Sequence, residues 1–253
     1  MALELVALVY SPYSERARWA LDHQGVEYRL LSYVPIVGEP ALRLRLRRFS
    51  GRVTVPVLFG AGEPIVDSTE IARFADRRGV GANLIPADST PEIMRWVRDA
   101  DRALSAGRNL VTLRTGRSRE ALVESLPPPL RRTGPVGLAI ARSGVELFTR
   151  KYGLATHDVA EDVDDISRFL ESWRKAIAGN EVLLGSFSYA DIVATSVLQL
   201  VEPVDDRFIP LGPATRDTWR IPELRTRFDD LVAWRDDIYA KYRKTPASDA
   251  NRD

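Results

Sequence analysis

The residues best suited to chemistry stand near the start of the chain, where a short apolar run leads into Ser11-Pro12-Tyr13-Ser14. Serine followed by proline is typical of a helix start, since serine caps the helix and proline needs no N–H partner in the first turn. The exposed N–H groups of such a start, with the helix dipole, favour a bound anion. A hydroxyl of Ser11 or Ser14 could donate to a bound thiolate and lower the pKa of that thiol. Ser11 taken alone fits a simple helix cap equally well.

A second motif, Val55-Pro56-Val57, places a proline inside a run that otherwise predicts a strand. Proline cannot donate to a neighbouring strand, so this position does not suit an ordinary central strand. Two alternatives follow from this. A cis bond before Pro56 could lie at an edge where free backbone groups pair with an extended peptide, or a trans proline could start the strand.

A third motif, Asp67-Ser68, stands at the start of another expected helix. A carboxylate and a hydroxyl beside exposed N–H groups could hold both charges of an amino-acid head group, although such a pair usually only caps a helix. Much later in the chain, Ser188-Tyr189-Ala190-Asp191 resembles a capping box, and we expect its role to be in folding.

The elements that must position the first three motifs form a small α/β unit over residues 1–80. Its first strand, helix and second strand form a βαβ unit, which requires a parallel strand pair and a right-handed crossover. The expected elements are a strand over 3–9, a helix over 11–25, a strand over 26–31, a helix or strand over 41–49, a strand over 53–59, its hairpin partner over 63–66 and a helix over 67–79.

The rest of the chain predicts an all-helical domain, because its apolar residues recur at intervals of three and four. Its expected parts are a linker over 81–90, the helical domain over 91–245 with an irregular stretch over 107–137, one long last helix opening at Pro222, and a disordered tail over 246–253.

Composition excludes several kinds of chemistry. The 253 residues include no cysteine and two histidines, which removes disulfides, thiolate metal sites and cysteine nucleophiles. The formal net charge of +1 gives no general attraction to nucleic acid or to anionic membranes. No apolar run approaches the roughly 20 residues of a membrane span, and the first residues read as a strand rather than a leader, so we expect a cytoplasmic protein.

The order and spacing of the motifs resemble the glutathione transferase superfamily over nearly the whole chain. The resemblance is carried by 11–18, 53–58, 65–71 and 187–192. It implies an α/β N-terminal thioredoxin-like domain, an all-α C-terminal helical domain, glutathione as cosubstrate, a small-molecule electrophile as second substrate and a homodimer. Partners of other kinds, nucleic acid or membrane, are not expected.

The resemblance also implies roles for particular residues. Serine at position 11 is similar to the serine-type classes, in which this residue activates the glutathione thiol, with Ser14 as the competing candidate. The residue before the cis-proline, here Val55 before Pro56, pairs with the cysteinyl backbone. The acid–serine pair that binds the γ-glutamyl head falls on Asp67 and Ser68. Two nearby phenols, those of Tyr10 and Tyr13, rank below the serines and fit a packing role.

Two departures from the family pattern bear on activity. Asp67 stands where family members often carry Glu or Gln, so its reach is one methylene shorter. The loop before Val53 does not resemble the segment that usually contacts the glycine carboxylate. Arg47 and Arg48 could supply that contact as bidentate donors, although the basic run 43–48 is also typical of a solvated helix face.

These observations leave four functional hypotheses. The first is a transferase whose bound thiolate attacks a small electrophile. The second keeps glutathione but makes the enzyme an isomerase, a lyase or a dehalogenase. The third is a catalytically silent ligand-binding or interaction module. The fourth follows from the excess of arginine over lysine among the 36 basic residues, a bias typical of genomes in which another low-molecular-weight thiol can replace glutathione.

Overall fold

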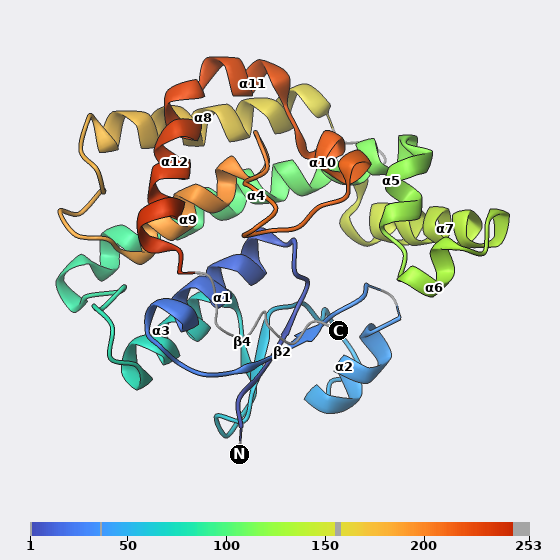
Figure 1. Ribbon diagram of the computed structural model, residues 1–253, viewed down its shortest axis with the longest axis horizontal. Coiled ribbons are helices and arrows are strands. Elements are labelled where there is room, and N and C mark those ends of the chain that lie inside the picture. Colours follow the sequence, from blue (N-terminus) through green and yellow to red (C-terminus); the bar gives the residue numbers. More distant parts are fainter. Residues whose placement is uncertain (1, 36, 155–157, 245–253) are drawn as a thin grey trace.

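The computed structural model describes residues 2–35, 37–154 and 158–244, and it has two parts stacked on each other (Figure 1). A four-stranded sheet with helices α1, α2 and α3 forms one part, and the remaining helices form the other. The expected fold class, a thioredoxin-like unit followed by a helical one, is confirmed. The tail expected to be disordered lies outside the described residues.

The first part begins with the expected βαβ unit. Strand β1 (Glu4–Ala7) pairs in parallel with β2 (Arg29–Ser32), and helix α1 (Pro12–His23) makes the crossover. Helix α1 begins with proline in its first turn and buries most of its side chains. The chain leaves the helix through Gly25, whose φ of +66° is a conformation that glycine adopts readily.

The hairpin that follows is shorter than expected. Strand β3 (Val57–Phe59) pairs antiparallel with both β1 and β4 (Ile65–Val66), which gives the strand order β2-β1-β3-β4. The strand expected over 53–59 is therefore wrong for its first four residues. Pro56 has no N–H group, so the ladder cannot continue through it, and pairing begins at Val57.

Two further helices complete this part. The ambiguous stretch after β2 is a helix, α2 (Glu39–Leu46), with only Leu42 buried. Helix α3 (Ser68–Arg78) starts at the Asp67 cap, buries Ile71 and Ala75 on one face as expected, and packs beside α1. A single 3₁₀ turn, η1 (Ala87–Ser89), then precedes the helical part.

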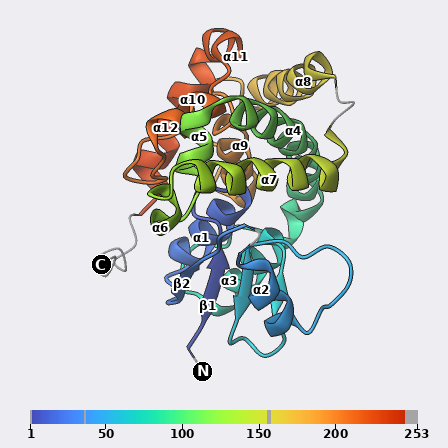
Figure 2. The same cartoon turned by 90° about the vertical axis from the view of Figure 1, so that its right-hand side faces the viewer.

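The helical part is built around two long helices that lie side by side, α4 and α8, with α7 crossing beneath them toward the sheet (Figure 2). Its helices are α4 (Thr90–Arg117), α5 (Arg119–Glu124), α6 (Pro128–Arg131), α7 (Pro135–Tyr152), α8 (Val159–Ile177), α9 (Tyr189–Leu198), α10 (Pro213–Trp219), α11 (Pro222–Arg227) and α12 (Asp229–Tyr242).

The irregular stretch expected over 107–137 is wrong. Helix α4 runs straight through Gly107 to Arg117, and α5, α6 and the start of α7 occupy the remainder. Glycine inside a helix costs about 1 kcal/mol of stability relative to alanine. Here close packing explains the glycine, because a Cβ at Gly107 would lie 2.0 Å from Cδ1 of Leu200.

The last long helix is also interrupted. The helix expected from Pro222 is two helices, α11 and α12, which meet at Phe228. The φ and ψ angles of Phe228, −119° and 34°, are not helical, and its side chain is fully buried. Burial of this aromatic ring in the core fixes a bend that the helical spacing of apolar residues does not reveal.

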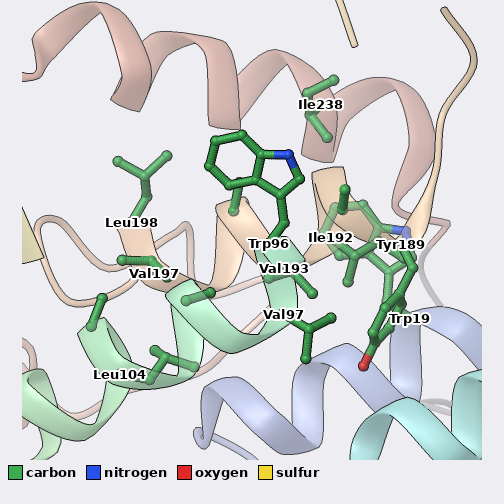
Figure 3. Packing of buried hydrophobic residues seen from close by; sticks show 14 of the residues in the cluster. Trp19, Trp96, Val97, Leu104, Tyr189, Ile192, Val193, Val197, Leu198 and Ile238 are labelled. Carbon is green, nitrogen blue, oxygen red and sulfur yellow. The ribbon is translucent and has the colours of Figure 1, made fainter. Parts of the chain in front are cut away.

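Helix α9 is the centre of the core. Val193, Val197 and Leu198 of α9 pack among side chains of α4 such as Trp96, while Tyr189, at the start of α9, lies beside Trp19 of α1 (Figure 3). The capping box expected at its start is confirmed. The Ser188 N–H and hydroxyl each donate to Oδ2 of buried Asp191, both at 2.9 Å. None of the helices in the described ranges is long and apolar enough to cross a membrane.

Candidate functional site

The sheet brings the three sequence motifs to one edge. Val57 pairs with Val6 of β1 on one side and with Val66 of β4 on the other. Val55 stands two residues before Val57, on the side where β1 leads into Leu8 and β4 leads into Asp67 and Ser68. The end of β1, the start of β3 and the end of β4 therefore share one edge of the sheet, and the helices α1 and α3 both begin there.

Ser11 stands at this edge as the N-cap residue of α1. It has extended backbone angles, is half-buried, and its hydroxyl makes no capping bond to the helix. Pro12 has no N–H group, and Glu15 N–H already donates to the Ser11 carbonyl. The Ser11 hydroxyl is thus free, beside the positive end of a 12-residue helix, to donate to an anion.

Ser14 differs from Ser11 in both exposure and bonding. Its side chain is fully buried, and its Oγ accepts a hydrogen bond from the Leu8 N–H at 3.2 Å. This bond joins the end of β1 to the first turn of α1. The two candidate serines are therefore distinguishable: Ser14 braces the turn, whereas the half-buried Ser11 hydroxyl makes no capping bond.

Val55 offers unused backbone groups. The peptide bond between Val55 and Pro56 is cis, which is one of the two alternatives considered for this motif. Within the ranges that the structure describes, neither the N–H nor the C=O of Val55 takes part in a hydrogen bond. An extended peptide segment beside Val55 could pair with both groups.

Asp67 and Ser68 form the start of α3. The Asp67 carboxylate caps the helix through Oδ1 alone, which accepts from Thr69 N–H at 2.7 Å and from Glu70 N–H at 3.4 Å, so Oδ2 remains available. Asp67 is exposed and has a φ of +91°. Ser68 is buried and faces Tyr189 of α9, whose pKa is raised by burial and partly lowered by the hydroxyls of Ser68 and Thr69.

The two phenols near Ser11 are poor candidates for a proton donor. Burial raises the pKa of Tyr10, and burial together with the charge of Asp101 raises the pKa of Tyr13 to about 12. Tyr10 packs edge-to-face on Trp219, with the ring centroids 6.2 Å apart, in the packing role expected for it. Tyr13 lies under the Arg16 guanidinium at 5.1 Å.

Arg47 lies away from these contacts, exposed at the end of α2 with a left-handed φ of 51°. The basic run around it is not simply a solvated face. Arg43 donates to Glu39 at 2.7 Å and to the Gly51 carbonyl at 3.0 Å, and Arg45 donates to Glu4 at 2.6 Å. These arginines hold α2 to the loop before β3 and to β1.

The helical side of the site has no counterpart among the residues predicted from the sequence. Arg16 of α1 is buried and donates to Ser196 of α9 at 2.8 Å and to Asp101 of α4 at 2.7 Å. Arg108, two turns further along α4, also acts on Tyr13, since its charge lowers the pKa that burial raises. Recognising that α4 continues through Gly107 would have placed Arg108 on the same helix face as Asp101.

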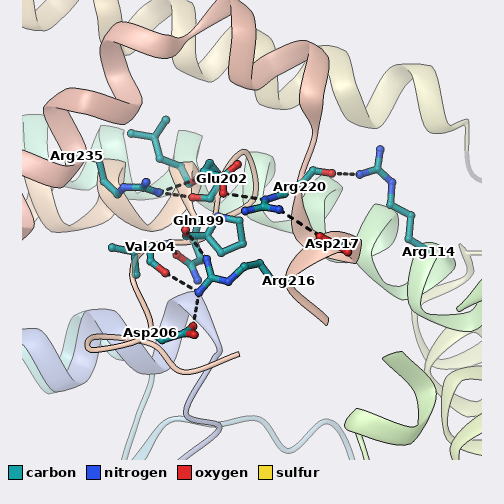
Figure 4. A network of polar contacts seen from close by, with 11 residues as sticks. Arg114, Gln199, Glu202, Val204, Asp206, Arg216, Asp217, Arg220 and Arg235 are labelled. Atoms are coloured by element: carbon teal, nitrogen blue, oxygen red, sulfur yellow. Dashed lines mark hydrogen bonds and ion pairs between the residues drawn. The ribbon is translucent and has the colours of Figure 1, made fainter. Parts of the chain in front are cut away.

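A cavity lies elsewhere in the molecule. It has a volume of about 500 Å³ between α4, α5 and α10, and none of the residues of the sheet edge lines it. Arginines brace this region (Figure 4): Arg216 donates to the carbonyls of Pro203 and Val204, and Arg220 donates to Glu202 at 2.9 Å and to Asp217 at 3.2 Å. We interpret this network as the support of the connection between α9 and α10.

Comparison with known proteins gives a consistent family. Residues 10–78 match the family model described as "Glutathione S-transferase, N-terminal domain". A probable glutathione S-transferase of Nicotiana tabacum is 30% identical over 106 residues, which are 41% of this chain and 46% of the relative. Glutathione S-transferase U7 of Arabidopsis thaliana is 29% identical over 125 residues, 49% of this chain and 54% of the relative. The chain thus spans about half the length of the curated relatives it matches.

Solved structures show the same fold over nearly the whole chain. A glutathione S-transferase of Ceriporiopsis subvermispora in complex with glutathione has a TM-score of 0.65 at 17% identity, with 98% of this chain and all of that chain covered. The beta-etherase LigF of Sphingobium sp. strain SYK-6 has a TM-score of 0.60 at 17% identity, with 95% and 96% covered. Across these structures the arrangement of sheet and helices is shared.

Proposed function

We propose that the chain is a member of the glutathione transferase superfamily that binds glutathione along the sheet edge formed by Ser11, Val55 and Ser68 and activates the thiol for attack on a small electrophile. The observation that carries this proposal is the free hydroxyl of Ser11 at the positive end of α1, beside the unpaired backbone of Val55. These two features together suit a cysteinyl residue with an ionised sulfur.

The residues of the edge fit the parts of the tripeptide. The Val55 N–H and C=O would pair with the cysteinyl backbone. The Ser68 N–H and hydroxyl, at the start of α3, would hold the γ-glutamyl carboxylate, and the free Oδ2 of Asp67 would accept from the ammonium group. Arg47 would reach the glycine carboxylate from the end of α2.

The reaction needs little from the protein besides a stabilised thiolate. The thiol proton passes to solvent, and the sulfur stays ionised because Ser11 donates to it and the α1 dipole favours negative charge. The thiolate attacks an electrophilic carbon, a carbon–sulfur bond forms, and the leaving group departs with its bonding electrons. A thiolate held in place near the electrophile also gains from orientation.

Two further expectations belong to this proposal. We propose a division into a glutathione-binding unit over 1–80 and a helical unit over 91–245 that walls the electrophile side. We also propose a homodimer, as is usual in the family, and sedimentation equilibrium of the purified chain tests it: a single species near the 28.3 kDa mass of one chain would contradict it.

Calorimetry and thiolate absorbance test the central claim. Wild type should bind glutathione, and the bound thiol should titrate below its solution pKa. Ser11→Ala should abolish that shift while retaining most of the affinity, since the backbone contacts remain. Absence of binding at millimolar glutathione would refute the proposal, and binding without a pKa shift would instead support the catalytically silent module.

Ser14→Ala is the matched control for the same experiment. It removes the brace to the Leu8 N–H but no group that faces the sulfur, so the thiol pKa shift should survive in the folded variant. Loss of the shift in Ser14→Ala alone, with the helical circular dichroism unchanged, would assign activation to Ser14 and overturn the role given to Ser11.

A further inference from the structure

One cation near the proposed sulfur site lacks an acidic partner. The Arg108 Nη2 donates to the neutral hydroxyl of Ser105 at 2.7 Å, and the buried Nε makes no hydrogen bond. Throughout the part of the chain that the structure describes, no carboxylate forms an ion pair with Arg108. A half-buried guanidinium without an anion is costly, so the site favours a ligand that supplies one.

A second arginine converges on the same place. The Arg108 guanidinium lies 4.0 Å from the centroid of the Tyr152 ring, and the Arg52 guanidinium lies 5.0 Å from the same centroid. Arg108 belongs to α4, Arg52 to the loop before β3, and Tyr152 to the end of α7. The end of α7 therefore meets both α4 and the loop before β3, and two positive charges lie around its one aromatic ring.

This pair of arginines lies next to the proposed reaction centre. Arg108 is close enough to the Tyr13 hydroxyl to lower its pKa, and Tyr13 is two residues from Ser11. Arg52 belongs to the sheet unit, three residues before Val55 in the loop that leads to β3.

We infer that Arg108, assisted by Arg52, selects electrophiles that carry a carboxylate. The inference rests on the proposed transfer of glutathione and adds the class of its second substrate. In the reaction, the thiolate sulfur forms a bond to the electrophilic carbon, the leaving group departs with its electron pair, and the carboxylate stays ionised on the two guanidinium groups. The Tyr152 ring holds both groups in position through cation–π contact.

Matched aromatic electrophiles test this. The probes are 4-chloro-3-nitrobenzoate and its uncharged analogue 4-chloro-3-nitrobenzamide, each rate divided by the uncatalysed rate with glutathione. Wild type should favour the benzoate, and Arg108→Gln should lower kcat/KM for the benzoate by roughly 10- to 100-fold while changing the benzamide by less than about threefold. For the benzoate, the kcat/KM of Arg108→Lys should lie between those of wild type and Arg108→Gln, because lysine keeps the positive charge but cannot bind a carboxylate through two parallel hydrogen bonds.

The same experiment shows whether Arg108 binds the carboxylate of the electrophile or the glycine carboxylate of glutathione. If Arg108 instead bound the glycine carboxylate of glutathione, Arg108→Gln would raise KM for glutathione with both electrophiles, which overturns the inference. Equal turnover of the two probes by wild type would also overturn it while leaving the proposed transferase function intact. Failure to bind glutathione at all would refute that function instead.

Two further variants serve as a control and as a second, independent test. Arg102→Gln removes an exposed arginine from the same helix and should leave both probes unaffected. Arg52→Gln removes the second guanidinium from a different element, so it remains informative if Arg108→Gln folds poorly. Benzoate preference unchanged in Arg52→Gln and in folded Arg108→Gln would overturn the inference.

Discussion

Glu15 and Arg243 lie 228 positions apart in the chain and form a buried ion pair, with 2.6 Å between Oε1 and Nε and each side chain 2% exposed. Arg243 also donates to Asp22 at 2.7 Å, and Glu15 pairs with Arg18 at 3.2 Å. The pair ties the end of α12 to α1, the helix whose N-cap residue is Ser11. It therefore holds the last turn of the helical part against α1.

Removing one partner of this pair should be costly. Arg243→Met leaves the Glu15 carboxylate buried without its main partner, and we expect a loss of about 3–5 kcal/mol in the free energy of unfolding, measured with urea. Arg168→Gln, which removes an exposed ion pair with Asp165, serves as control and should cost less than about 1 kcal/mol. A loss below 1 kcal/mol in Arg243→Met would contradict the structural role of the pair.

Two glycines of α4 should respond in opposite ways to the same substitution. Gly107→Ala places a Cβ 2.0 Å from Leu200 Cδ1 and should destabilise the protein by about 1–3 kcal/mol through overpacking. Gly116→Ala meets only Val145 Cγ1, at 3.0 Å, and should be neutral or stabilising by up to about 1 kcal/mol. Thermal unfolding of both variants checks this, and similar melting temperatures would contradict the close approach at Gly107.

Asp67→Asn separates ligand binding from helix capping. Asparagine caps a helix as well as aspartate does, so the melting temperature should stay within about 2 °C of wild type. Loss of the charge that would face the γ-glutamyl ammonium should raise KM for glutathione roughly 10-fold or more. Steady-state kinetics at varied glutathione measures this. An unchanged KM would show that Asp67 is only a cap.

His23 should make stability fall with acidification. Burial lowers its pKa from the ordinary value of 6.5, against a raising contribution from its 3.1 Å contact with the Ala82 carbonyl. The unfolded chain then binds the proton more readily, so stability is lost as the pH falls from above 6.5 through the lower folded pKa. Urea unfolding between pH 7.5 and 5.5 should show a steeper loss in wild type than in His23→Gln. Parallel curves would contradict the prediction.

Sequence patterns were sufficient for the parts of the fold that local chemistry controls. Serine and proline placed the start of α1, the Asp67 cap placed the start of α3, and Ser188 with Asp191 placed the start of α9. Each of these signals acts within one helical turn. Residues far apart in the chain are not needed to read them.

Contacts between distant residues decided the rest. Gly107 does not break α4, because Leu200 packs against it, and Phe228 bends the last helix, because its ring belongs in the core. From the sequence, Ser11 was the first candidate for thiol activation and Ser14 the competing one. The fold separates them by hydrogen bonding. The Ser14 hydroxyl accepts from the Leu8 N–H, whereas the Ser11 hydroxyl makes no capping bond.

By itself, the sequence determined the family resemblance, the absence of thiol chemistry within the chain, and the three motifs that the sheet edge brings together. Only the tertiary structure set Arg108 beside Tyr152, and tied the chain's far end to α1 through Arg243. The physical reason is that capping and turn preferences are local, whereas the charge, burial and reach of a side chain depend on what other elements place around it.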